Sequence, residues 1–150
     1  MSNKSGYKKS WYKEWFGEDY LTVYQHRDEN DASRLIDLIL KHTQITANTR
    51  LLDLACGNGR HTYLIKKYTN NVLGLDLSAS LLKVAQKRKI PGQFPAFVRG
   101  DMRYLPFNVP FDVIFSLFTS FGYFDDDQMH LQVAKQIADC LVIKGNFYAN

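Results

Sequence analysis

The chain has 150 residues, of which 45% are hydrophobic and 14% aromatic, and it carries a formal net charge of +4 with a pI of about 9.0. This length and composition exclude a disordered chain and predict one folded domain with a single sizeable core. No apolar stretch approaches the roughly 20 residues that a membrane-spanning helix needs. Since the N-terminus also lacks the apolar run of a secretory signal, we expect a cytoplasmic location and no membrane contact.

Basic side chains gather at two places, residues 4–13 and residues 83–89. The second cluster closes a predicted helix, where cations complement the negative end of the helix dipole. We therefore favour a solvated helix end over a nucleic-acid surface, and we expect no nucleic-acid partner.

The N-terminal part of the chain is expected to be helical. Residues 11–24 are unusually rich in aromatic side chains, and Gly17 interrupts them, so two short helices are expected rather than one. These rings either cover the outside of the core or form a lid over a bound ligand, where aromatic faces attract cationic groups. Residues 35–40 then show helical spacing, with Asn30 or Asp31 as the N-cap.

Strands and helices alternate through the rest of the chain, which predicts an α/β fold with a doubly wound, mainly parallel sheet of about five strands. We treat residues 1–150 as one domain, with an N-terminal helical segment over 1–45 and a core over 49–150. The predicted strands cover 50–55, 72–76, 96–99 and 111–116, and a fifth starts at 146–149. One predicted helix covers 59–68, and a second runs from Ser78 to its end at Pro91-Gly92. A third runs from the acids at 125–127 to about Val142 and is closed by Gly145.

An acidic residue lies at the carboxyl end of each of the first three strands, at Asp53, Asp76 and Asp101. Open α/β sheets place their ligands at the carboxyl ends of parallel strands, so these acids are expected to share one ligand crevice. The first strand also runs into a tight turn that contains Gly57 and Gly59, where bare backbone can approach a ligand.

The spacing of these residues indicates a nucleoside without phosphates. Asp76 lies 17 residues beyond Gly59, close to the spacing at which an acid accepts hydrogen bonds from ribose hydroxyls. A dinucleotide fingerprint would place a third glycine at position 62, which is Thr62 here. The chain also lacks a glycine-rich phosphate loop with its Lys-Ser/Thr pair.

Five segments in order resemble those of class I S-adenosylmethionine-dependent methyltransferases, in particular the small-molecule branch. They are 15–28, which resembles N-terminal segments found in that branch, 52–60 (LDLACGNGR), 74–78 (GLDLS), 100–107 (GDMRYLPF) and 111–124. The resemblance extends over about residues 11–150. It implies a Rossmann-like methyltransferase core with an aromatic N-terminal lid, and S-adenosyl-L-methionine as the cofactor.

The resemblance also assigns roles to single residues. Gly57 and Gly59 would let backbone approach the methionine moiety, Asp53 would orient its ammonium group through water, and Asp76 would bind the ribose diol. Asp101 would accept a hydrogen bond from the adenine amino group. Leu77 and Met102 would enclose the adenine ring, and Phe118 and Tyr123 would form the wall of the acceptor site. The full set of implied cofactor residues is Asp53, Ala55, Gly57, Gly59, Asp76, Leu77, Asp101, Met102, Leu117, Tyr20 and Arg27.

No catalytic residue can be assigned, because a sulfonium methyl group is already activated and its transfer needs mainly alignment and water exclusion. His26, His61 and His130 are each either a base or a structural histidine. The acids at 125–127 suit the positive end of a helix dipole better than a metal, and Cys56 and Cys140 have no metal spacing, so no metal is expected.

Class I methyltransferases usually have seven strands, whereas this chain has about five. Strand five would then have an exposed edge, so we expect the sequence to be a fragment or another chain, such as a second copy, to cover that edge. Three functions remain open. The first is a methyltransferase with an unidentified acceptor, which is expected to be a small molecule. The second is a cofactor-binding module that is inactive without a partner, and the third is an RNA or protein methyltransferase, suggested by the pI of 9.0.

Overall fold

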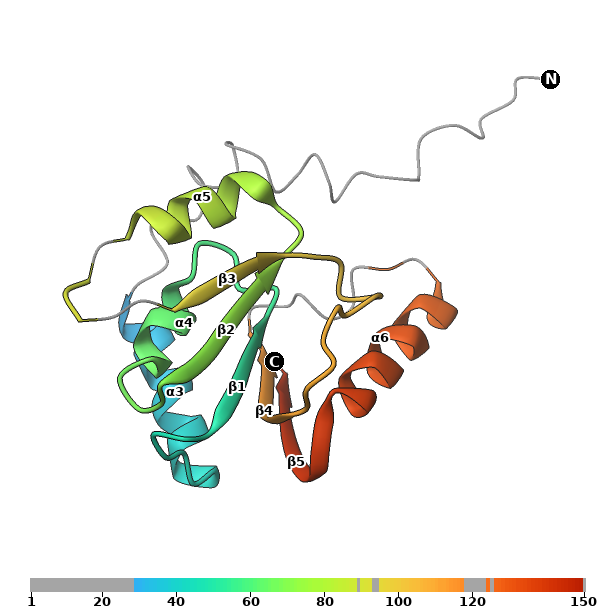
Figure 1. Cartoon of the computed structure of the whole chain (residues 1–150), viewed down its shortest axis with the longest axis horizontal. Helices are drawn as coiled ribbons and strands as arrows, with labels where there is room; N and C mark the ends of the chain where they lie inside the picture. Colours follow the sequence, from blue (N-terminus) through green and yellow to red (C-terminus); the bar gives the residue numbers. More distant parts are fainter. Residues whose placement is uncertain (1–28, 89, 93–94, 118–123, 125, 150) are drawn as a thin grey trace.

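A computed structural model of the protein describes the chain except for residues 1–28, 89, 93–94, 118–123, 125 and 150 (Figure 1). The described helices and strands alternate along the chain, as the sequence pattern predicts. In order they are α3 (Glu29–His42), β1 (Arg50–Leu54), α4 (Arg60–Ile65), β2 (Asn71–Asp76), α5 (Ala79–Lys87), β3 (Ala96–Arg99), β4 (Phe111–Ser116), α6 (Asp127–Asp139) and β5 (Leu141–Ala149).

The described strands form one parallel sheet with the order β3-β2-β1-β4-β5. From β1 the chain first builds outward through β2 to β3, and then crosses back to place β4 on the other side of β1. The strand order therefore reverses between β1 and β4, and such a reversal opens a crevice at the carboxyl ends of the strands. The predicted fold class, a doubly wound parallel sheet of about five strands, is confirmed.

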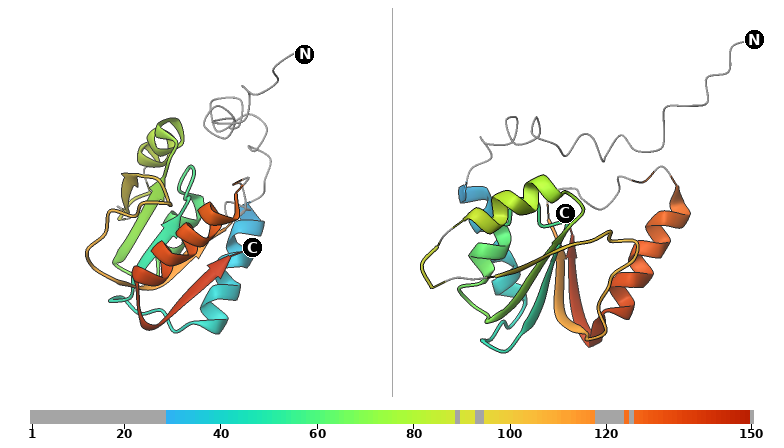
Figure 2. Two further views of the ribbon diagram at one scale, coloured as in Figure 1. Left: turned by 90° about the vertical axis from the view of Figure 1, so that its right-hand side faces the viewer. Right: turned by 45° about the horizontal axis from the view of Figure 1, so that its top comes forward.

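Helices cover both faces of the sheet, with α3 and α4 on one side and α6 on the other (Figures 1 and 2). Neighbouring residues of one strand therefore enter different clusters of the core. Leu51 packs with Ile39 of α3 and with Phe115, whereas Leu52 packs with Val133 of α6. A strand that is buried on both faces reads as a continuous apolar run, which is why the central strands could be located from the sequence.

The junction between α6 and β5 differs from the sequence prediction. The helix ends at Asp139 with Cys140 as its C-cap, and the strand begins at Leu141, so the expected helix end near Val142 and closure by Gly145 are wrong. Gly145 instead lies inside β5, beside Lys144 with a φ of 67° and next to a register shift against β4. Phe111 pairs with Leu141 whereas Val113 pairs with Asn146, so β5 has three extra residues at this point, more than the single residue of a simple β-bulge.

The start of the described chain also differs in one detail. Asn30 and Asp31 lie within α3 and do not cap it. The described part of the predicted N-terminal segment, α3, packs Ile36 and Ile39 into the core, while the aromatic residues at 11–24 lie outside the described residues. None of the helices in the described part of the chain has the length and apolar character to cross a bilayer.

Candidate functional site

The turn between β1 and α4 contains three residues in the left-handed region within five positions. Ala55 has a φ of 61°, Gly57 of 56° and Gly59 of 75°. For Ala55 this conformation costs roughly 1–2 kcal/mol, since its Cβ approaches the following carbonyl. Backbone strain of this kind is concentrated at functional sites, where the surrounding structure maintains it.

The two glycines of this turn have different surroundings. A Cβ added to Gly57 would meet no atom of the described residues within 4 Å, so among these residues the backbone of Gly57 faces open space. A Cβ added to Gly59 would lie 2.8 Å from Cζ of Phe97 and 3.0 Å from Cβ of Ala85. Gly57 is therefore the glycine that a ligand can approach, whereas Gly59 lets the turn pack against β3 and α5.

Asp76 joins this turn to the ends of β2 and β3. Its Oδ2 accepts a hydrogen bond from the backbone N–H of Gly57 at 2.7 Å, and its Oδ1 accepts one from Ser78 at 2.7 Å. Its backbone carbonyl accepts from the N–H of Gly100 at 3.0 Å, one residue before Asp101. The structure thus brings together the three predicted segments that carry Gly57, Asp76 and Asp101.

Asp53 lies in the adjacent strand and is 1% exposed. Burial, with a smaller contribution from the charge of Asp76, raises the pKa of Asp53 to about 7. The hydroxyl of Thr62, which is fully buried, donates a hydrogen bond to Oδ2 of Asp53 at 2.5 Å and opposes this rise. From the sequence, Thr62 only argued against a dinucleotide site. Its contact with Asp53 was not predicted.

The buried carboxyl of Asp53 makes stability depend on pH. Because its pKa is raised above the ordinary 3.8, the folded state binds more protons than the unfolded state between about pH 4 and pH 7. Stability is therefore expected to fall as the pH rises through this range. Between pH 5 and pH 8 the wild type should lose roughly 3 kcal/mol more than Asp53→Asn, which stays neutral.

Urea denaturation of both proteins at these two pH values measures this difference. The amide oxygen that replaces a carboxylate oxygen in the variant can still accept from Thr62, so the variant tests the charge and not the hydrogen bond. Equal pH dependence in the two proteins would contradict the raised pKa.

Asp101 lies at the next strand end and forms an ion pair with Arg103, whose Nη2 is 2.5 Å from Oδ2 of Asp101. The side chains of Arg103 and Asp101 are 17% and 23% exposed. From the sequence, Asp101 is expected to bind adenine, and Arg103 has no predicted role. The i,i+2 spacing of opposite charges within the loop was the only signal that could have indicated the pair.

The apolar residues of the predicted site differ in their packing. Leu77 is half-buried directly after Asp76, Met102 is half-buried against the cluster on the α6 side, and Leu117 is buried in the cluster on the α3 side. The remaining predicted residues, Tyr20, Arg27, Phe118 and Tyr123, lie outside the described residues.

Ser116, at the carboxyl end of β4, was also missed by the sequence analysis. It is 1% exposed, and its Oγ has no hydrogen-bond partner among the described residues. A buried hydroxyl without a partner is costly. Together with the open space at Gly57, this hydroxyl fits a site that accepts a polar ligand at the strand ends.

Other reactive side chains of the described chain offer no strong catalytic group. Burial lowers the pKa of His61 to about 4, so its imidazole is neutral and weakly basic at pH 7. Nε2 of His130 lies 2.7 Å from the carbonyl of Phe124. Burial raises the pKa of the Cys56 thiol, so Cys56 is protonated and inert at pH 7. The described residues contain no group of three side chains suited to a metal ion.

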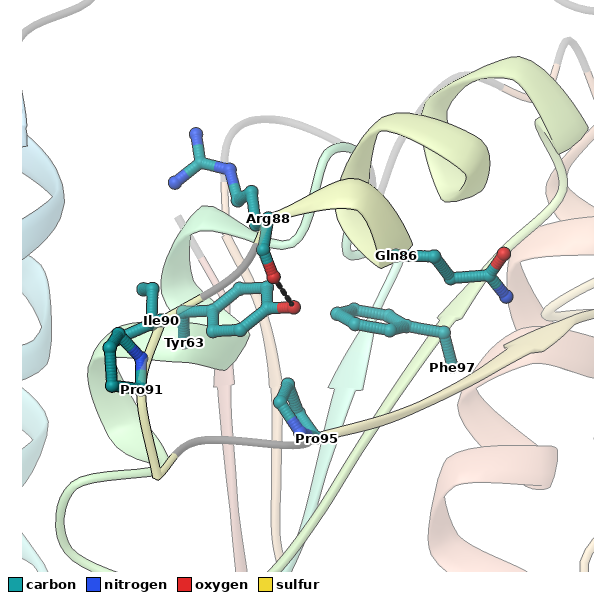
Figure 3. A pocket seen from close by; sticks show the side chains of 7 residues that line it. All are labelled: Tyr63, Gln86, Arg88, Ile90, Pro91, Pro95 and Phe97. Atoms are coloured by element: carbon teal, nitrogen blue, oxygen red, sulfur yellow. Dashed lines mark hydrogen bonds between the residues drawn. The ribbon is translucent and has the colours of Figure 1, made fainter.

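A separate pocket of about 530 Å³ lies between α4, the end of α5 and the start of β3 (Figure 3). Tyr63 of α4 and Phe97 of β3 form its aromatic wall, with ring centroids 5.9 Å apart. The Tyr63 hydroxyl donates to the carbonyl of Arg88 at 2.7 Å. None of the predicted cofactor residues that the structure describes lines this pocket, so it is distinct from the candidate site at the strand ends.

With this geometry in place, comparison with known proteins identifies the family. The family described as "Methyltransferase domain" matches residues 51–145, more than half of the chain. The chain belongs to the methyltransferase domain family. The class I methyltransferase relationship inferred from the ordered motifs is thereby confirmed.

Relatives of this methyltransferase domain include a dTDP-3-amino-3,4,6-trideoxy-α-D-glucopyranose N,N-dimethyltransferase of Streptomyces venezuelae. It is 36% identical over 93 residues, which cover 62% of this chain and 37% of that protein. A demethylmenaquinone methyltransferase of Thermotoga maritima is 33% identical over 113 residues, 73% of this chain and 46% of that protein. The chain therefore spans less than half the length of these relatives.

Solved structures show the same fold. The SAM-bound amino pentose methyltransferase CalS10 of Micromonospora echinaspora has a TM-score of 0.71 at 25% identity, over 87% of this chain and 55% of that one. DesVI of Streptomyces venezuelae has a TM-score of 0.69 at 27% identity, over 93% of this chain and 56% of that one. Both likenesses extend over most of this chain.

Proposed function

We propose that this chain is the S-adenosylmethionine-binding core of a methyltransferase that acts on a small molecule. The observation that carries the proposal is the junction at Asp76, whose carboxylate accepts from Gly57 and whose backbone accepts from Gly100. This junction gathers three strand ends, each with an acidic residue, at the switch point of a methyltransferase sheet. Membership of the methyltransferase domain family supports the choice of cofactor.

Bound S-adenosylmethionine would supply an activated methyl group on its sulfonium. The chain's own residues would then bind and orient it. Asp76 retains acceptor capacity for the ribose hydroxyls, Asp101 would accept from the adenine amino group, and Asp53 would provide a carboxylate near the methionine ammonium. The open backbone at Gly57 gives the methionine moiety room to approach.

A small-molecule acceptor is supported by the relatives, which differ in substrate. One relative is named for an amino sugar nucleotide and another for demethylmenaquinone. Because the family varies its acceptor in this way, the shared core serves the cofactor and other segments select the acceptor. Phe118 and Tyr123 remain our candidates for the acceptor wall, and amino sugar nucleotides are the first compounds for a methyl-transfer screen.

Calorimetry with S-adenosylmethionine tests the proposal. The wild type is expected to bind one equivalent, and binding should tighten from pH 5 to pH 8 as Asp53 ionises opposite the ammonium group. Asp53→Asn should remove this pH dependence. Absence of binding by the wild type at both pH values would overturn the cofactor assignment.

The edge of the sheet favours a second candidate function. This is a cofactor-binding module that needs further polypeptide for catalysis. Within the described chain β5 pairs with β4 alone, and it exposes 95% of Ile143 and 36% of Phe147. An edge strand with apolar side chains is a template for pairing with another strand. We propose that a further segment of a longer protein, or a second copy of this chain, covers this edge.

Size-exclusion chromatography with light scattering tests this candidate. The 150-residue chain is expected to self-associate, and Ile143→Lys should shift it towards the monomer, because an edge lysine opposes strand pairing. The exposed Lys135→Glu on α6 is a control that changes charge away from the edge. A monodisperse, fully active wild-type monomer would contradict the candidate.

A further inference from the structure

Arg103 contacts the carboxylate of Asp101 through both its guanidinium and its backbone N–H. Its Nε lies 3.0 Å from Oδ1 and 3.1 Å from Oδ2, its Nη2 lies 2.5 Å from Oδ2, and its backbone N–H donates to Oδ1 at 2.9 Å. The planar guanidinium thus lies against both oxygens of the carboxylate. This fork geometry fixes the plane of the carboxylate, which a single point charge could not do.

Arg103 is in turn positioned by α6 and by Phe124, which precedes that helix. The guanidinium carbon lies 5.4 Å from the ring centroid of Phe124, and Nη1 lies 3.8 Å from Sδ of Met129. Gln132 donates to the backbone carbonyl of Arg103 at 2.9 Å. The Phe124 ring therefore packs against the guanidinium, and Gln132 fixes the backbone of Arg103. The orientation of the guanidinium does not depend on Asp101 alone.

The loop that carries both residues is anchored to the same helix. The backbone N–H of Leu105 donates to Oε1 of Gln136 at 2.7 Å, and the loop runs beside α6 (Figure 1). At its other end, Gly100 is bonded to Asp76. Asp101 therefore lies between a fixed strand end and a fixed arginine, an arrangement in which one orientation of its carboxylate is selected before any ligand binds.

We propose that Arg103 is a positioning residue for adenine recognition: it orients the Asp101 carboxylate so that this group distinguishes a 6-amino purine from a 6-oxo purine. The inference rests on the proposed function, which places adenine against Asp101. A carboxylate accepts from an exocyclic amino group but repels a carbonyl oxygen at the same position. If Arg103 served only to attach the loop to α6, its loss would weaken both purines equally.

The test compares two ligands, S-adenosylhomocysteine and S-inosylhomocysteine, by calorimetry. The wild type should prefer the adenosine compound by about 10- to 100-fold, the range that one hydrogen bond to a charged group contributes. Arg103→Met, which keeps much of the side-chain length without the fork, should reduce this preference to within about three-fold, as should Asp101→Asn. Arg103→Lys, which keeps the charge, should give an intermediate ratio and substitutes for Arg103→Met if that variant does not fold.

Arg50→Met is the matched control, because Arg50 also pairs with an aspartate, Asp112, but at the opposite end of the sheet. It should lower stability and leave the preference unchanged. If the wild type prefers the adenosine compound and Arg103→Met shows the same preference, the inference is overturned while the proposed function stands. A wild type that binds both ligands equally would also overturn it, and one that binds neither would overturn the proposed function itself.

Discussion

Replacing Gly59 with alanine is expected to destabilise the protein by roughly 2–5 kcal/mol. About 1–2 kcal/mol comes from the left-handed backbone, with a φ of 75°, and about 1–3 kcal/mol from overpacking against Phe97. The new Cβ would lie 2.8 Å from Cζ of Phe97 and 3.0 Å from Cβ of Ala85, so at least one of these neighbours must shift. Urea denaturation gives the change in the free energy of unfolding.

Gly57→Ala is the informative comparison within the same turn. Its φ of 56° carries the same backbone cost, but its Cβ would meet none of the described atoms within 4 Å. We therefore expect a loss of only about 1–2 kcal/mol in stability. Affinity for S-adenosylmethionine should fall more in Gly57→Ala than in Gly59→Ala, because the Gly57 Cβ enters the space that the cofactor would occupy.

Two further variants separate backbone strain from packing. Ala55→Gly relieves a left-handed alanine in this turn and should stabilise the protein by about 0.5–1 kcal/mol, the strain relief less the added entropy of the unfolded chain. Phe97→Leu should restore part of the stability lost in Gly59→Ala, since the two sites are in contact. Equal stability losses in the two glycine variants would contradict the different roles assigned to Gly57 and Gly59.

The different roles of these glycines illustrate what the sequence could and could not predict. The turn itself follows from local chemistry, because an apolar strand, two glycines and a helical pattern occur in succession. The clash at Gly59 depends on Phe97, which lies in β3 and belongs to a different part of the pattern. Contacts between residues so far apart in the chain leave no local signal, so only the structure could assign Gly59 to packing.

The acids of the site show the same division. Parallel strands bring their carboxyl ends to one edge, so Asp53, Asp76 and Asp101 could be grouped from the order of strands alone. Their individual partners could not be predicted. Asp53 accepts from Thr62, within the first turn of α4, and Asp101 is bonded to Arg103. These pairings depend on side-chain directions that sequence spacing does not determine.

The end of α6 shows how a local signal can mislead. Gly145 after an apolar run is typical of a helix C-terminus, and Val142 and Ile143 extend the apolar pattern. The structure places these residues in β5, where β-branched side chains suit the extended backbone and where Leu141 before them and Asn146 after them pair with β4. Tertiary pairing therefore determines where this helix ends.

Asp76→Ala is expected to lower affinity for S-adenosylmethionine by at least about 100-fold, because two hydrogen bonds from ribose hydroxyls to a carboxylate would be lost. A carboxylate has about four lone-pair sites, and the bonds from Gly57 and Ser78 leave acceptor capacity for a ribose diol. The variant also detaches the glycine turn from the end of β2, so the position of Gly57 itself is disturbed.

Stability should change less than affinity, by roughly 1–3 kcal/mol. Two backbone donors lose their partner, but burial raises the pKa of Asp76, so removing its charge relieves a desolvation cost that offsets part of the loss. Asp112→Ala provides the control, since the Asp112 carboxylate accepts from the backbone N–H of Arg50 at 2.7 Å at the start of β4, away from the crevice. If both variants lost affinity equally, destabilisation would explain the effect. Loss in Asp76→Ala alone would assign the cofactor site to the junction of Asp76 and Gly57.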